Sequence, residues 1–328
     1  MSTANRGKIS FRVDGMMVWG DELCYNNGIW RKWMQTRKKT KMRNRMIMWR
    51  GAVAAAVIVA VSGVVAAEPG LATFISHRGE SVDAPENTLP AYRTAVSRGF
   101  GFECDIYLSA DRRVFTFHDR TLTRTTSGAN TNKCTDATWS TISKLDVGSW
   151  GKFKGSKFAG TRPALLEEVL ELTKDGRWLY IDVKSRTADI VPYVRDVFAK
   201  QTRATPKNTL FLCGSLECGK AFKKLMPEYK VLSCLNCCRG WKPGAKPVPV
   251  EEIIAVTKEM GADGVDLRYI PEVTTAEYMK KIKDAGLELH VWTVDDLADA
   301  EEAFRRGAQT VTTNCAKKQL DEYRAKNN

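Results

Sequence analysis

Histidine is scarce in this chain, and its placement is the strongest chemical signal in the sequence. The chain has three histidines in 328 residues, and two of them, His77 and His118, follow apolar β-type runs and stand beside charged residues. Active sites of barrels and other α/β folds are built just beyond the C-terminal ends of strands. The two imidazoles can give or take a proton near neutral pH, so they predict a general acid and a general base.

A pair of carboxylates lies between these two histidines in the sequence. Glu103 and Asp105 have the i, i+2 spacing that places both side chains on one face of a strand. Two carboxylates held together repel each other unless a cation joins them, so the pair predicts a hard divalent ion, Mg²⁺ or Ca²⁺. Asp182, at the end of another apolar run, is expected to be the third ligand. The alternative is that these are surface carboxylates paired with nearby Arg and Lys.

The neighbouring residues suit a phosphodiester. Such a monoanion must be held and attacked in line while its leaving alkoxide is protonated. The ion and Arg78 would neutralise the phosphoryl oxygens, the arginine by a bidentate contact, and Lys184 would add a point charge. Asn87 is expected to contact the phosphate, and Glu86 to order the same loop. The sequence does not decide which histidine is the acid, and the third, His290, is interpreted as structural.

The elements that must position these residues alternate strands with helices. From residue 72 onward, β-branched or aromatic runs alternate with helical segments, which predicts parallel βα units. About 260 residues follow the leader, the usual size of a (β/α)8 barrel. There are nine strand candidates for eight places: 73–76, 100–107, 114–117, 178–183, 209–213, 230–235, 264–267, 288–293 and 310–313. Helix candidates include 89–98, 164–173, 188–200, 250–260, 275–285 and 297–306.

The chemical residues belong to an ordered series of short motifs. The series is His77-Arg78-Gly79, Pro85-Glu86-Asn87-Thr88, Glu103-x-Asp105, His118-Asp119, Thr125-Thr126-x-Gly128, Asp182-x-Lys184 and Trp292-Thr293-Val294. With it the chain resembles the glycerophosphodiester phosphodiesterase family over residues 73–315. The resemblance implies an irregular (β/α)8 TIM barrel of the PLC-like phosphodiesterase type, with a small lobe inserted at 121–162. It also implies metal-dependent hydrolysis of glycerophosphodiesters to glycerol 3-phosphate and an alcohol.

The resemblance further implies that Trp292 is an aromatic wall against the glycerol moiety; core packing is the alternative.

The chain departs from the family at three places. Asp182 stands where Glu is usual, Cys213-Gly214-Ser215 where Ser-Phe is common, and Thr313-Asn314 where Thr-Asp is usual. The shorter Asp182 leaves open whether it binds the ion directly or through water, and the other two departures leave the pocket shape and the substrate open. A phospholipase D-like lyase and a non-catalytic phosphodiester-binding barrel are the competing interpretations, and the lobe is interpreted as a lid, an acceptor for the alcohol group or a structural flap.

The net charge of +13 does not indicate a nucleic-acid partner, because most of it lies in a leader. Residues 1–67 hold 12 Lys and Arg against 3 Asp and Glu, whereas 68–328 hold 39 against 35. Residues 46–67 have the basic, apolar and small-residue regions of a signal peptide. The expected protein is exported, periplasmic or secreted, with its barrel at 72–320. A membrane anchor at 51–67 is the alternative, although this run is short for a span.

The first 45 residues fit no signal peptide. They are interpreted as an upstream stretch that is not translated, with the true start at Met46 or Met48, or as a disordered cytoplasmic tail. The expected partner is a small-molecule glycerophosphodiester, with membrane contact only through the leader or a lipid-derived substrate.

Five cysteines lie within 26 residues: Cys213, Cys218, Cys234, Cys237 and Cys238. In an exported protein this predicts at least one disulfide, whereas a zinc site is the alternative in a cytosolic one. Cys104 lies between the two predicted ligands on their strand. It should point to the opposite face and serve packing.

Overall fold

The computed structural model describes residues 12–13, 16–17, 73–174 and 176–327. The predicted signal peptide at 46–67 and most of the basic leader lie outside these ranges. Two short strands near the N-terminus, β1 (Arg12–Val13) and β2 (Met16–Met17), pair antiparallel with each other. Within the described ranges no helix has the length and apolar character needed to cross a bilayer, and the candidate anchor at 51–67 falls outside them.

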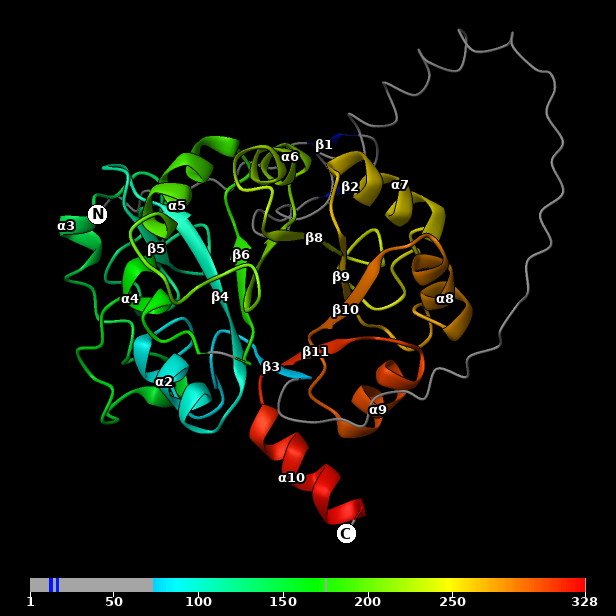
Figure 1. Cartoon of the computed structure of the whole chain (residues 1–328). Helices are drawn as coiled ribbons and strands as arrows, with labels where there is room; N and C mark the ends of the chain where they lie inside the picture. Colours follow the sequence, from blue (N-terminus) through cyan, green and yellow to red (C-terminus); the bar gives the residue numbers. More distant parts are fainter. Residues whose placement is uncertain (1–11, 14–15, 18–72, 175, 328) are drawn as a thin grey trace, which may run out of the picture. The chain divides into compact units, whose positions relative to one another are not determined.

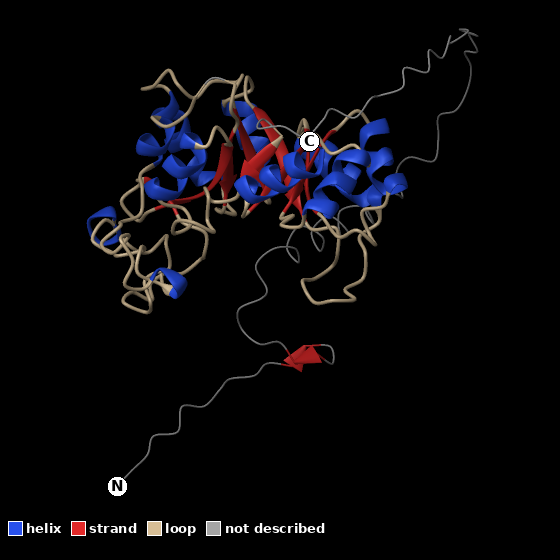
Figure 2. Cartoon of the chain, turned by 90° about the horizontal axis from the view of Figure 1, so that it is seen from below, coloured by secondary structure: helices blue, strands red, loops and turns tan. Residues whose placement is uncertain are grey.

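Eight parallel strands close into a barrel with helices on its outside (Figures 1 and 2). The order around the barrel is β3-β11-β10-β9-β8-β7-β6-β4, and a pairing between β3 and β4 closes the ring. The predicted TIM barrel is therefore confirmed. The strands are β3 (Phe74–Ser76), β4 (Gly101–Leu108), β6 (Leu179–Val183), β7 (Thr209–Cys213), β8 (Lys230–Leu235), β9 (Gly264–Arg268), β10 (Glu288–Trp292) and β11 (Thr310–Thr313).

The ninth candidate, β5 (Val114–Thr116), is the one that does not belong to the ring. It pairs antiparallel with the end of β4, where Ile106 faces Thr116. The strand β3 is short, and on the side that faces β4 it reaches only the first two residues of that strand, Gly101 and Phe102. The end of β4 is therefore free to pair with β5. The barrel is irregular at this position, where His77 follows β3 and His118 follows β5.

The helices cover the outer face of the barrel. All six candidates from the sequence form, the third of them beginning as a short 3-10 segment at Ala188–Ile190, and α6 and α10 are additional. Thr88 caps α2, accepting from the N–H of Ala91, and Gly99 follows its end with φ of 85°. The helices are α2 (Leu89–Ser97), α4 (Leu166–Leu170), α5 (Val191–Phe198), α6 (Leu216–Leu225), α7 (Val250–Met260), α8 (Ala276–Asp284), α9 (Leu297–Arg305) and α10 (Ala316–Asn327).

Apolar side chains fill the barrel on both faces of the sheet. Between strands and helices, aromatic pairs dominate: Phe211 of β7 stacks on Phe222 of α6 with ring centroids 4.2 Å apart, and Tyr92 of α2 stacks on Phe102 of β4 at 4.9 Å. The barrel interior holds a buried cluster, which closes the barrel below the polar site: Ile75, Tyr180, Leu210, Leu212, Leu232 and Cys234, with Trp178 and Trp292 packed against it.

The inserted lobe has its own core, built against β5. It contains a short helix, α3 (Trp139–Ile142), and a 3-10 turn, η1 (Gly151–Phe153). The apolar side chains of the lobe join those of β4, β5 and the chain just after β5 in one buried cluster, so the lobe is a packed part of the barrel domain. The cluster comprises Tyr107, Phe115, Phe117, Leu122, Cys134, Ala137, Ile142 and Val147.

The predicted disulfide is wrong in this structure, because every cysteine in the described ranges is a free thiol. Cys213 pairs in register with Ser233, so Cys213 and Cys234 project to opposite faces of the sheet. The Sγ atoms of the adjacent Cys237 and Cys238 lie 4.0 Å apart, about twice the length of a disulfide bond. The zinc alternative also fails among the described residues, where only carboxylates form a group able to hold a metal. Cys104 is fully buried, as predicted.

Candidate active site

The three predicted metal ligands lie together at the barrel mouth. Glu103 and Asp105 project from β4, and Asp182 of β6 is the register partner of Asp105. All three are buried, and one oxygen of each lies within 4.8 Å of the others. Burial and the neighbouring carboxylates raise the pKa of Glu103 well above its usual range, and burial also raises that of Asp182. Three such groups cannot all be ionised at low cost without a cation.

The donor set fits a hard divalent ion. Glu103 Oε1 and Asp182 Oδ1 are buried and have no hydrogen-bond partner within the described part of the chain. Buried carboxylate oxygens without partners are costly, and a cation with all-oxygen ligands would satisfy them. Asp182 is shorter than the Glu usual in the resembled family, but its carboxylate still lies within the group of three. The observed arrangement is therefore compatible with the three predicted ligands.

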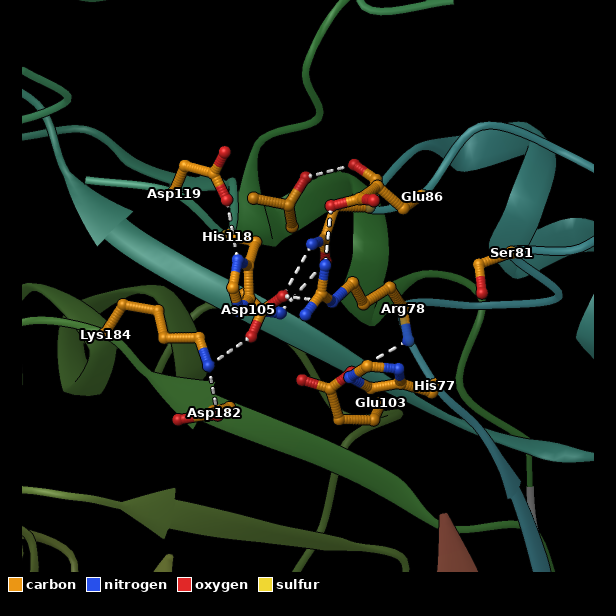
Figure 3. A network of polar contacts seen from close by, with 12 residues as sticks. His77, Arg78, Ser81, Glu86, Glu103, Asp105, His118, Asp119, Asp182 and Lys184 are labelled. Atoms are coloured by element: carbon orange, nitrogen blue, oxygen red, sulfur yellow. Dashed lines mark hydrogen bonds and ion pairs between the residues drawn. The ribbon is translucent and has the colours of Figure 1, made fainter. Parts of the chain in front are cut away.

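Lys184 lies among the carboxylates. Its Nζ atom is 2.8 Å from Asp105 Oδ1 and 2.6 Å from Asp182 Oδ2, so it bridges the two strands (Figure 3). Its side chain is only 8% exposed. Burial opposes ionisation of Asp105, but Lys184, His118 and Arg78 together hold the pKa of Asp105 well below its usual range. Asp105 is therefore the carboxylate that stays ionised.

The turn after β3 carries Arg78 into the same cluster. The backbone N–H of Arg78 donates to Glu103 Oε2 at 2.8 Å, and its Nη1 donates to Glu86 Oε1 at 2.8 Å. Gly79 has φ of 77°, and a Cβ there would lie 2.6 Å from the carbonyl carbon of Ala91. Only glycine fits this close approach of the turn to α2, which explains the third position of His77-Arg78-Gly79.

Asn87, predicted to contact the phosphate, binds Asp105 directly. Its Nδ2 donates to Asp105 Oδ2 at 2.6 Å, and its Oδ1 accepts from the N–H of Asp105 and from the hydroxyl of Tyr92. The side chain is buried, and these bonds occupy both ends of its amide. The contacts of Asn87 are those of a residue that orients Asp105. One N–H of its NH₂ group has no bond among these contacts, and the phosphate contact expected from the sequence stays a prediction.

His77 directly follows β3, and its Nδ1 atom lies 2.7 Å from Asn314 Oδ1. Asn314 follows β11, the barrel neighbour of β3. Burial and the charge of Arg78 lower the pKa of His77 to about 3. The imidazole is therefore neutral near pH 7 and can accept a proton.

His118 follows β5 and has a carboxylate partner instead of an amide. Its Nδ1 atom lies 2.7 Å from Asp119 Oδ1 (Figure 3). Burial, Lys184 and Arg78 lower the pKa of His118, whereas Asp105 and the hydrogen bond that the imidazole donates to Asp119 raise it in part. The structure thus brings both predicted histidines to the carboxylate cluster.

Arg124 of the inserted lobe was not singled out from the sequence. Its guanidinium binds the two carboxylates that hold the site together, Asp119 and Glu86, with four hydrogen bonds of 2.6–3.0 Å. It also lies over the ring of Trp150, 4.8 Å from the ring centroid. The sequence signal was its position directly before the Thr125-Thr126-x-Gly128 motif.

Trp292 and His290 both face the barrel interior from β10. Trp292 ends the strand, its Nε1 donates to the carbonyl of Asp266 at 3.1 Å, and its ring lies 5.9 Å from that of Trp241. His290 is buried deeper, with its Nδ1 atom 2.7 Å from Thr310 Oγ1 and 3.0 Å from the hydroxyl of Tyr180. The contacts of His290 are those of a structural residue, as expected.

Comparisons with known proteins agree with this geometry. A model of the glycerophosphoryl diester phosphodiesterase family matches residues 77–318, a range that contains the whole site. A glycerophosphodiester phosphodiesterase of Caldanaerobacter subterraneus subsp. tengcongensis is 31% identical over 244 residues, which cover 73% of this chain and 93% of that protein. One from Bacillus subtilis is 29% identical over 255 residues, covering 73% and 82%. The structure of an Oleispira antarctica phosphodiesterase in complex with the product sn-glycerol-3-phosphate has a TM-score of 0.64 at 23% identity, covering 76% of this chain and 96% of that one.

Proposed function

The chain belongs to the glycerophosphoryl diester phosphodiesterase family, and on that basis we propose that it hydrolyses glycerophosphodiesters to glycerol 3-phosphate and an alcohol with a divalent ion and two histidines. Its membership makes it an enzyme, a phosphoric diester hydrolase on a TIM barrel. The observation that carries the finer proposal is the buried group of three carboxylates with a histidine on either side and two cationic side chains in contact with it.

Glu103, Asp105 and Asp182 would hold the ion, and their all-oxygen set favours Mg²⁺ or Ca²⁺ over softer metals. When bound, the ion would neutralise the phosphoryl oxygens and so favour attack at phosphorus. The proposal is supported by the unpartnered carboxylate oxygens described above.

The protein's own cations would complete the phosphate site. The guanidinium of Arg78 is held between Glu86 and Asp105, with its Nε atom 3.3 Å from Asp105 Oδ2. A guanidinium fixed in this way binds a phosphoryl group through its N–H donors without a large loss of side-chain entropy. Lys184 would add the second positive charge. These two cations offset the charge that develops on the phosphoryl oxygens.

The two histidines would move the protons. One takes a proton from the attacking water molecule, and the other donates one to the oxygen of the departing alcohol. Trp292 would lie against the glycerol moiety. The related Oleispira structure contains sn-glycerol-3-phosphate, and this supports the same product here.

A direct assay tests the proposal. Turnover of glycerophosphocholine by the purified chain should require Mg²⁺ or Ca²⁺ and stop in excess EDTA. Glu103→Gln should abolish both turnover and calorimetric binding of the ion, whereas Glu171→Gln, an exposed carboxylate of the same fold, should change neither. Full activity in excess EDTA would reject the metal dependence.

We also propose export, on the pattern at 46–67. N-terminal sequencing of the natural protein should find a mature terminus near Glu68. Peptides from before Met46 would reject the untranslated leader, and an intact chain retained in the membrane would favour the anchor at 51–67.

A further inference from the structure

The Nδ1 atoms of the two histidines have chemically different partners, an amide oxygen for His77 and a carboxylate for His118. We propose that Asn314, held by Asp295, is a positioning residue that fixes His77 as the neutral tautomer with its proton on Nδ1, which makes His77 the general base and leaves His118 as the general acid. The assignment of base and acid rests on the proposed function, whereas the tautomer does not depend on it.

The direction of each hydrogen bond follows from Asp295. Asn314 Nδ2 lies 2.7 Å from Asp295 Oδ2, and an ionised carboxylate can only accept. The NH₂ group of Asn314 must therefore face Asp295, and its oxygen must face His77. Because an amide oxygen cannot donate, His77 Nδ1 must carry the proton of this 2.7 Å bond. Nε2 of the neutral ring is then left with its lone pair.

Asp295 is itself fixed in place. Besides the side chain of Asn314, it accepts from the backbone N–H of Asn314 at 2.8 Å and from Thr313 Oγ1 at 3.0 Å. Ser81 Oγ donates to Asn314 Oδ1 at 3.1 Å, a contact that agrees with this orientation of the amide. The amide therefore has one orientation that satisfies Asp295. Flipping it would place the amide oxygen against the carboxylate of Asp295, two acceptors with no proton between them.

The difference between amide and carboxylate decides the roles. A carboxylate favours the charged imidazolium, so Asp119 helps His118 to hold the proton that an acid must give. An amide is neutral and stabilises an imidazolium less than a carboxylate does. His77 therefore begins each cycle neutral. The aspartate usual in the family at this place is replaced here by Asn314, which removes a negative charge next to the base.

The proton transfers balance in this assignment. As the oxygen of water bonds to phosphorus, its proton passes to His77 Nε2. The bond between phosphorus and the alcohol oxygen breaks, and that oxygen takes the proton of His118. After the products leave, His77 returns its proton to solvent and His118 gains one, so no other reactant is needed.

Nitrogen NMR of the full chain labelled with ¹⁵N-histidine tests the tautomer without any substrate. At neutral pH His77 should show a protonated Nδ1 and an unprotonated Nε2. Asp295→Asn should release the amide of Asn314 and produce a population with the proton on Nε2, and it should lower kcat by about 10- to 100-fold with little change in KM. The matched control is Asp296→Asn, because the side chain of Asp296 caps α9 by accepting from the N–H of Asp299.

Asn314→Asp provides the second measurement. The added carboxylate should raise the pKa of His77, so the acidic limb of the kcat/KM profile should move to higher pH. A wild-type His77 that is protonated on Nε2 at neutral pH would overturn the proposal, as would an Asp295→Asn variant with unchanged tautomer and kcat. If the chain turns over no diester, the NMR result alone decides the tautomer, and the failure then belongs to the proposed function.

Discussion

Arg124 binds Asp119 through two hydrogen bonds, from Nε to Oδ2 at 2.6 Å and from Nη2 to Oδ1 at 3.0 Å. The same guanidinium binds Glu86, which in turn holds Arg78. A residue of the inserted lobe therefore connects the partner of one histidine with the partner of the phosphate-binding arginine. This contact indicates that the lobe orders the site, a role that differs from the lid, the alcohol acceptor and the structural flap considered from the sequence.

Arg124→Lys should lower kcat roughly tenfold, or about 1.4 kcal/mol in the barrier, because lysine keeps the charge but cannot bind two carboxylates through a planar fork. Steady-state kinetics would measure the effect. Arg113→Lys is the control, since Arg113 makes a single exposed ion pair with Glu167. Equal kcat values for both variants would show that the lobe contact has no part in turnover.

The histidines should separate clearly in an alanine series. His77→Ala and His118→Ala should each lower turnover by about 100- to 10,000-fold, the usual cost of losing a general acid or base. His290→Ala removes buried hydrogen bonds to Thr310 and Tyr180 and should instead cost about 1–3 kcal/mol of unfolding free energy. Denaturant unfolding and kinetics on the same samples distinguish these effects. Comparable losses of turnover at all three positions would mean that the site is assigned to the wrong residues.

The strands could be predicted from the sequence because each is a buried run of apolar residues bounded by turns. Which of the nine lies outside the ring could not, because the Val-Phe-Thr run of β5 resembles the others and only the length of β4 decides its partner. Helix α6 was not among the helices expected from the sequence, and it contains Gly219, a residue type unfavourable inside a helix. A Cβ there would lie 2.3 Å from Met260 Sδ of α7, so a larger residue would have to displace that side chain.

The site residues could be predicted by type, but their contacts could not. The motifs indicated Asn87 and Thr313-Asn314 as features of the site. Only the three-dimensional structure shows that Asn87 orients Asp105 and that Asn314 faces His77. These contacts join residues separated by 18 and 237 positions in the chain, and no local pattern in the sequence encodes them.

Asp119→Asn should shift the alkaline limb of the pH profile. The carboxylate of Asp119 raises the pKa of His118 against the lowering by burial. Its removal lowers that pKa, so His118 loses its proton at a lower pH, and kcat/KM should begin to fall at a lower pH than in the wild type. Asp136→Asn, an exposed carboxylate paired with Lys133, is the control. A shift of the acidic limb alone would assign the acid role to the other histidine.

Thiol counting checks the cysteines. All eight cysteines after residue 67 are free, and burial raises the pKa of several, among them Cys213 and Cys234. A thiol reagent should therefore react slowly with the native protein and should titrate eight thiols per chain beginning at Glu68 once it is denatured without reductant. Six or fewer would show that a disulfide forms in the protein's own compartment.

Phosphorus NMR of the reaction with glycerophosphocholine tests the central claim most directly. With Mg²⁺ or Ca²⁺ present, the signal of the diester should give way to that of glycerol 3-phosphate as the stable product, with any cyclic phosphate only transient, and excess EDTA should prevent the change. His77 and His118 support this outcome because such a pair can complete attack by water. A cyclic phosphate signal that persists, or activity confined to intact diacyl lipid, would contradict the hydrolase and favour the lyase.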